Sequence, residues 1–92
     1  MRLRYTADAR RSLRNLRADL QRRAPGTADK TLREIRDAVH RAQRMPRSGR
    51  QVPEFSSPNV REMIVLPYRV WDELLDNEVL IIAVFHGARD TR

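Results

Sequence analysis

Apolar residues in the first half of the chain recur at helical spacing in two segments. The first segment carries Ala9, Leu13, Leu16 and Leu20. Steps of four, three and four residues place these side chains on one face of a helix. Thr6 precedes the run as a candidate N-cap, so the pattern predicts a helix over residues 6–24.

The second segment repeats this spacing with a different set of side chains. It carries Ala28, Leu32, Ile35, Val39 and Ala42. Between the segments, Ala24-Pro25-Gly26 is expected to end the first helix, because proline lacks a backbone donor and glycine tolerates tight turns. We therefore expect a second helix over residues 27–44 and an antiparallel helical hairpin.

The remaining chain has the composition and alternation of short strands. Residues 45–59 contain proline, glycine and serine without an apolar period and predict a loop. The predicted strands cover residues 2–5, 60–66, 68–75 and 78–86. This order predicts a single α+β domain over residues 1–92, in which the helical hairpin packs on an antiparallel sheet.

The last predicted strand is apolar on both faces from Val79 to Val84. Such a strand suits the centre of a sheet, with the helices on one side and another element on the other. We expect a helical partner to cover that second side. Cover by sheet twist and the C-terminal tail is the alternative.

Charge divides the chain into two unequal halves. The net charge is +7, from 19 basic and 12 acidic residues, and Lys30 is the single lysine. Residues 1–50 hold 15 cations and 5 acids, a balance of +10, whereas residues 51–92 hold 4 cations and 7 acids, a balance of −3. Arginine pairs well with carboxylate and phosphate, so the pattern indicates an anionic partner. Solvation of the helices by arginine is the alternative.

Composition argues against several classes of protein. The chain has no cysteine and only two histidines, so we expect no metal site and no cofactor. No apolar run approaches the roughly 20 residues that cross a bilayer. We therefore expect a cytoplasmic protein without a membrane partner.

Four polar residues in the second half could form an RNA-cleaving site. They are Glu54, Arg61, Arg69 and His86. Cleavage by the ribose 2′-hydroxyl needs a base, cations for the phosphorane charge and an acid for the leaving oxygen. Glu54, the two arginines and His86 could supply these groups without a metal. The structural alternatives are a cross-strand ion pair for Arg61, a solvated Glu54 and a histidine that bonds a backbone carbonyl.

The order of short motifs resembles the RelE/ParE superfamily of bacterial type II toxins. The motifs are Pro46 with Gly49-Arg50, Val52-Pro53-Glu54, Val60-Arg61-Glu62, Pro67-Tyr68-Arg69-Val70, Val79-Leu80-Ile81 and His86-Gly87-Ala88-Arg89-Asp90. The resemblance implies a growth-inhibiting toxin that is neutralised by a cognate antitoxin in a hetero-oligomer. It also implies that operator DNA is contacted only through the antitoxin.

Two mechanisms divide the superfamily. ParE-like members inhibit DNA gyrase by binding it, and the ending His86-Gly87-Ala88-Arg89-Asp90 is similar to their pattern, so we favour this branch. RelE-like members cleave mRNA on the ribosome, and Glu54, Arg61, Arg69 and His86 match positions of that site, so a metal-independent endoribonuclease is the alternative. A basic nucleic-acid-binding domain is a third hypothesis. The candidate binding residues are Arg50, Arg89, Arg10, Arg14 and Arg17.

Overall fold

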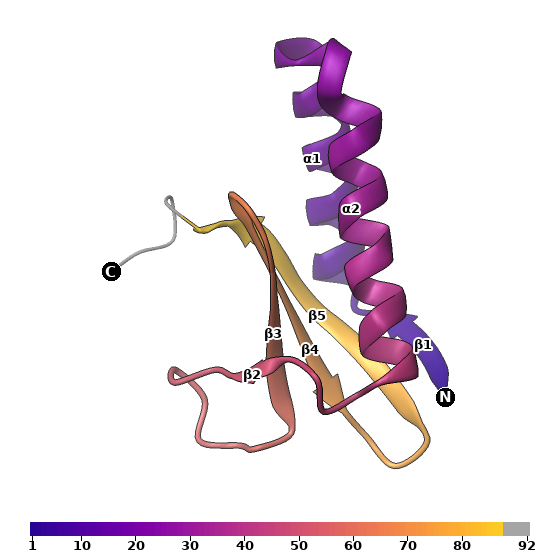
Figure 1. The fold of residues 1–92 in the computed structure, drawn as a ribbon, viewed down its shortest axis with the longest axis vertical. Helices are drawn as coiled ribbons and strands as arrows, with labels where there is room; N and C mark the ends of the chain where they lie inside the picture. The colour runs from indigo at the N-terminus through magenta and orange to yellow at the C-terminus, as the bar shows by residue number, and fades with distance from the viewer. Residues whose placement is uncertain (88–92) are drawn as a thin grey trace.

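The computed structural model describes residues 1–87, and Figure 1 shows two long helices on one side of a sheet. The elements are β1 (Arg2–Tyr5), α1 (Ala7–Arg23), α2 (Pro25–Arg44), β2 (Arg50–Gln51), β3 (Val60–Val65), β4 (Tyr68–Leu74) and β5 (Glu78–His86). The predicted α+β architecture, a helical hairpin packed on a sheet, is confirmed. No helix within residues 1–87 is long and apolar enough to cross a bilayer.

The helical hairpin turns more tightly than expected. The side chain of Thr6 accepts a hydrogen bond from the backbone N–H of Ala9 at 3.0 Å, as its predicted N-cap role requires. Helix α2 begins at Pro25 and not at Thr27. Proline suits the first position of a helix because its missing N–H would have no partner there. The turn therefore needs only Ala24, and the tip of the hairpin projects beyond the sheet (Figure 1).

The sheet has five strands in the order β1-β5-β4-β3-β2. Strand β1 pairs with β5 in parallel, and the other neighbours are antiparallel. The expected loop over residues 45–59 is interrupted by β2, whose Arg50 pairs with Glu62 of β3. A strand of two residues is too short to show an alternating pattern, so the sequence carried no sign of it.

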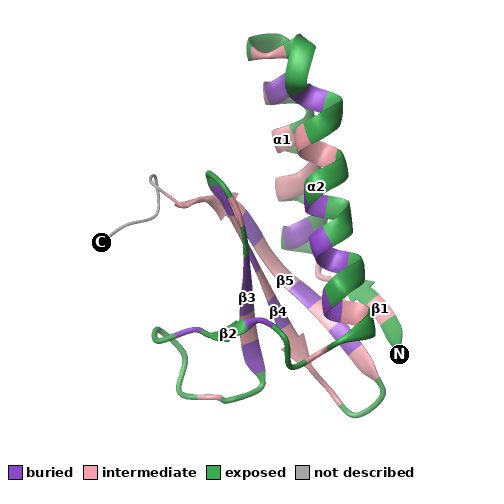
Figure 2. Ribbon diagram, in the orientation of Figure 1, coloured by how far each residue is buried: buried purple, intermediate pink, exposed green. Residues whose placement is uncertain are grey.

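The core lies between the helices and one face of the sheet, which we call the helix face. The sheet contributes Met63, Tyr68, Val70, Val79, Ile81 and Val84, and the helices contribute Ala9, Ile35, Ala38, Val39 and Ala42. Small alanines let the helices approach the strands closely, and each fully buried Val or Ile contributes about 1.5–3 kcal/mol. Figure 2 shows the buried residues concentrated where α2 and the strands face each other.

Candidate functional site

The second face of the sheet is directed away from the helices, and we call it the open face. It carries Glu62, Ile64, Arg69, Trp71 and Phe85, because side chains alternate along each strand and Ile64 pairs with Arg69 across β3 and β4. The segment between β2 and β3 lies on this side of the sheet (Figure 1). It brings Glu54 and Phe55 to the open face.

A buried carboxylate organises the open face. The side chain of Glu62 is 0% exposed and accepts hydrogen bonds from Arg50 Nε at 2.7 Å, from Trp71 Nε1 at 2.9 Å and from Arg69 Nε. Burial acts to raise the pKa of Glu62, but the hydrogen bonds from Arg69, Trp71 and Arg50 outweigh it and hold that pKa below its ordinary value. The carboxylate therefore stays charged and fixes three side chains from two neighbouring strands.

The aromatic side chains of this face contact one another edge to face. The ring centroids of Trp71 and Phe85 are 5.0 Å apart, and those of Phe55 and Trp71 are 5.3 Å apart. The guanidinium carbon of Arg69 lies 5.3 Å from the centres of both the Trp71 and the Phe85 rings. Arg69 is thereby held by an ion pair and by two cation–π contacts.

Gly49 makes room for the strand that carries Arg50. A Cβ at this position would lie 2.8 Å from the backbone oxygen of Glu62 and 3.1 Å from the Cβ of Arg61. Backbone atoms of a paired strand cannot move away at low cost, so only glycine allows β2 to approach β3 this closely. The close approach of β2 to β3 thus explains the glycine of the Gly49-Arg50 motif, which the sequence alone did not explain.

The structure divides the four candidate catalytic residues between the two faces. Glu54 and Arg69 come together on the open face, with Glu54 Oε2 3.8 Å from Arg69 Nη2. Arg61 lies opposite Asp72 in the register of β3 and β4, on the helix side of the sheet, and its Nη1 donates a hydrogen bond to the Gly49 carbonyl at 3.3 Å. His86 contacts the ring of Tyr68 edge-on, with centroids 5.5 Å apart, and Tyr68 belongs to the helix-face core. The side chains of Arg61, Arg69 and His86 therefore do not surround one position at which a phosphate could bind.

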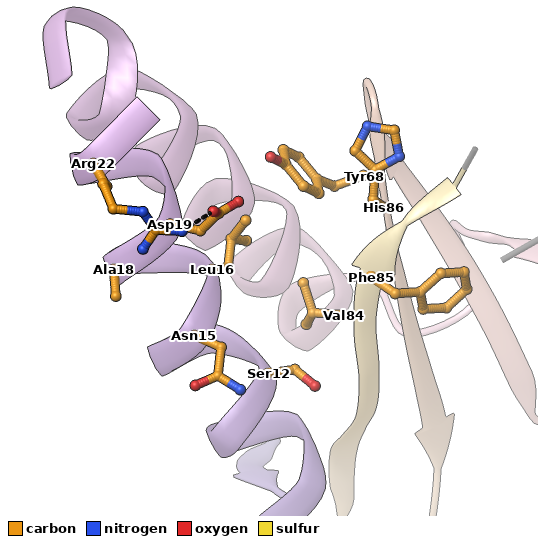
Figure 3. A pocket seen from close by; sticks show the side chains of 10 residues that line it. All are labelled: Ser12, Asn15, Leu16, Ala18, Asp19, Arg22, Tyr68, Val84, Phe85 and His86. Carbon is orange, nitrogen blue, oxygen red and sulfur yellow. Dashed lines mark hydrogen bonds and ion pairs between the residues drawn. The ribbon is translucent and has the colours of Figure 1, made fainter. Parts of the chain in front are cut away.

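His86 borders a cleft of ≈ 590 Å³ between α1 and the end of β5. Figure 3 shows Val84 directed toward α1 and Phe85 directed the opposite way, as alternation along β5 requires. The helix wall of this cleft is mixed: it carries Ser12, Asn15 and the Asp19–Arg22 ion pair at 2.8 Å beside the apolar Leu16 and Ala18. Within residues 1–87, no group of three or more His, Cys, Asp or Glu side chains could hold a metal ion.

A second candidate surface is the interhelical groove, a depression of ≈ 510 Å³ between α1 and α2. Four arginines border it, namely Arg14, Arg17, Arg33 and Arg36, and its apolar lining includes Leu13, Leu32 and Ile35. None of these arginines forms an ion pair with another part of the chain described here. The groove combines an apolar floor with an excess of positive charge, because Asp29 is the one carboxylate among the described residues that line it.

The candidate binding residues are distributed over several surfaces. Arg14 and Arg17 border the interhelical groove, and Arg10 is exposed one turn earlier on α1. Arg50 lies on β2 beside Glu62, with its side chain 62% exposed. Arg89 lies outside the described residues.

Sequence reasoning missed several residues of these surfaces. Glu62 was quoted within a motif but given no role, since nothing local marks a carboxylate that is buried by distant strands. Nothing local in the sequence indicated that Phe55, Trp71 and Phe85 contact one another on one face of the sheet. Arg33 and Arg36 are three residues apart on α2, and pairing this spacing with that of Arg14 and Arg17 could have indicated a shared groove.

Comparisons with known proteins agree with the fold. A family model described as the ParE toxin of the type II toxin-antitoxin system parDE matches residues 3–91. A solved structure described as the chromosomal ParDE TA system from P. aeruginosa contains a similar chain, with a TM-score of 0.75 at 21% identity over 94% of this chain and 95% of that chain. None of the curated proteins matches this chain. Because the family model spans almost the whole sequence, the chain belongs to the ParE toxins of type II toxin–antitoxin systems.

Proposed function

We propose that this toxin inhibits growth by binding DNA gyrase and that it does not depend on RNA cleavage. The observation that carries the proposal is the separation of Arg61 from Arg69 on opposite faces of the sheet. A phosphorane formed during RNA cleavage needs its cations around one phosphate. Arg69 is in addition neutralised by Glu62, which leaves little positive charge for a substrate.

The test compares two readouts in one experiment. Purified protein is added to gyrase with relaxed plasmid, and mRNA integrity is followed in cells shortly after induction. We expect loss of supercoiling or accumulation of cleaved DNA, with intact mRNA at early times. Early mRNA cleavage with normal supercoiling would contradict the proposal.

A RelE-like ribonuclease is the second candidate, because Glu54 lies beside Arg69 on the open face. In that case Glu54 would accept the 2′-hydroxyl proton while Arg69 bound the phosphate. The Glu54→Ala variant separates the candidates. It should abolish mRNA cleavage in a ribonuclease, whereas a gyrase-binding toxin should still inhibit supercoiling, at most with a weaker affinity because Glu54 lies on the open face.

The antitoxin partner follows from family membership, and we propose that it docks in the interhelical groove. Carboxylates of an amphipathic antitoxin helix would pair with Arg14, Arg17, Arg33 and Arg36, while its apolar side chains would cover Leu13 and Leu32. The same arginines could instead contact phosphates, as in the nucleic-acid-binding hypothesis, which predicts a steep salt dependence. We place the action of the toxin in the cytoplasm, where its proposed target works.

A further inference from the structure

The open face differs in charge from the rest of the molecule. Arg50 and Arg69 are balanced there by Glu54 and Glu62, although the whole chain carries a net charge of +7. A surface that binds nucleic acid has the opposite property, because it gathers unneutralised cations along the phosphate path. Depletion of net charge around aromatic residues is typical of the centre of a protein–protein interface.

The aromatic residues of this face do not form a platform for nucleobases. Stacking needs an accessible ring face. The guanidinium of Arg69 lies over the Trp71 ring, and Phe55 and Phe85 contact the same tryptophan at interplanar angles of 82° and 89°. The side chains of the cluster therefore pack against one another, and a partner would contact the outer surface of the whole cluster.

Exposed apolar side chains surround this cluster. Five large hydrophobic side chains are exposed within residues 1–87, and three of them, Phe55, Ile64 and Leu66, lie on or beside the open face. Leu66 is 85% exposed at the turn between β3 and β4. Arg50 bonds Glu62 through Nε, and within residues 1–87 its terminal nitrogens have no hydrogen-bond partner, so they can pair with a carboxylate of another protein.

We infer that the open face is a protein-docking surface through which the toxin engages its target, and that Glu62 is the positioning residue of this surface. The partner would present an apolar patch to Phe55, Ile64 and Leu66 and a carboxylate to Arg50. Glu62 acts through Arg50, Arg69 and Trp71, whose conformations it holds before the partner arrives, which lowers the entropic cost of binding. The identity of the target as gyrase rests on the proposed function above; the location of the surface does not.

The experiment uses the full chain with three substitutions. Ile64→Arg places a charge in the exposed apolar rim without touching the core. Glu62→Gln removes the central carboxylate charge, and Asp37→Asn is the matched carboxylate-to-amide control on the exposed surface of α2, away from the open face. We expect Ile64→Arg and Glu62→Gln to raise the concentration for half-inhibition of supercoiling by about tenfold or more. Asp37→Asn should inhibit like the wild type.

Two further measurements separate positioning from folding. Trp71 is the single tryptophan, so its emission should shift in Glu62→Gln and stay unchanged in Asp37→Asn. Thermal unfolding should show that Ile64→Arg, which places a second cation opposite Arg69, loses only about a few degrees of Tm and stays folded at the assay temperature. If Glu62→Gln does not fold, Ile64→Arg alone still tests the docking surface.

Failure of this inference and failure of the proposed function give different results. Equal inhibition of gyrase by the wild type and Ile64→Arg would overturn the inference and leave the proposed function intact. If the wild type arrests growth without affecting gyrase, the proposed function fails and growth arrest becomes the readout. Loss of growth arrest in Ile64→Arg would then support the docking surface. Retained growth arrest in this variant would overturn it. Binding of a labelled single-stranded RNA 20-mer that is lost in Ile64→Arg would overturn the assignment to a protein partner.

Discussion

Arg61 and Asp72 are cross-strand partners on β3 and β4, beside a β-bulge at Trp71 and Asp72. Asp72 is only 1% exposed, and neither of its carboxylate oxygens has a hydrogen-bond partner in the described chain. Burial raises the pKa of Asp72 to about 6, although the positive charge of Arg61 acts to lower it. Burial in the interior of the toxin therefore favours the protonated form of the Asp72 carboxyl group more strongly than water does.

The contribution of Asp72 to the stability of the fold should therefore decrease as the pH rises from about 4 to about 6. The pKa of an aspartate in an unfolded chain is about 3.9. In that window the native state binds more protons than the unfolded state, so the free energy of unfolding falls as pH rises, by up to about 3 kcal/mol. Asp72→Asn should remove this slope and stabilise the protein at pH 7 by about 1–2 kcal/mol. Urea unfolding at pH 4, 5, 6 and 7 measures the effect.

The control for this experiment is Asp76→Asn, since Asp76 is exposed in the turn before β5. It should keep the wild-type pH profile. Parallel profiles for the wild type and Asp72→Asn would show that Asp72 has an ordinary pKa in the folded protein.

A second prediction concerns the cation beside Asp72. Arg61→Met keeps the length of the side chain and removes its charge. At pH 7 it should destabilise the protein by about 1 kcal/mol, because the buried carboxylate loses its counter-charge. In an Asp72→Asn background this electrostatic part of the loss should disappear. The double-mutant cycle in urea measures the coupling, and an equal loss in both backgrounds would mean that Arg61 contributes through packing or through Gly49 alone.

Two glycines offer a matched pair of substitutions. Gly49→Ala should destabilise the protein by about 1–3 kcal/mol, since its Cβ would meet the backbone oxygen of Glu62 at 2.8 Å. Gly26→Ala should stabilise it by up to about 1 kcal/mol, because Gly26 lies in the first turn of α2 with nothing within 4 Å of the added Cβ. Thermal unfolding of both variants checks the two signs, and a neutral Gly49→Ala would show that β2 can move away from β3.

Charge reversal tests the interhelical groove. The double variant Arg33→Glu, Arg36→Glu should weaken binding of the cognate antitoxin by about tenfold or more, because carboxylates of the partner would face carboxylates of the toxin. Isothermal titration at two salt concentrations measures the affinity. Arg47→Glu is the control, since Arg47 lies in the loop after α2 and does not line the groove. Equal weakening by Arg47→Glu would indicate that net charge, and not the groove, governs the affinity.

The sequence determined the parts of this protein that depend on local pattern. The four-and-three spacing of Ala9, Leu13, Leu16 and Leu20 predicted the first helix, and Thr6 marked its start, because helical periodicity and capping involve residues only a few positions apart. Alternation and β-branched residues located β3, β4 and β5 within a residue or two at their ends. The order of motifs was sufficient to indicate the toxin superfamily.

Only the tertiary structure decided which side chains share a face. Arg61 and Arg69 are eight residues apart, an even spacing that in an uninterrupted strand would place both on the same side. The turn at Leu66 and Pro67 and the register of β3 against β4 place them on opposite sides. The burial of Glu62 beneath Arg50, Arg69 and Trp71 likewise depends on pairing among three strands. Such register is set by the packing of the whole sheet, which no short window of sequence contains.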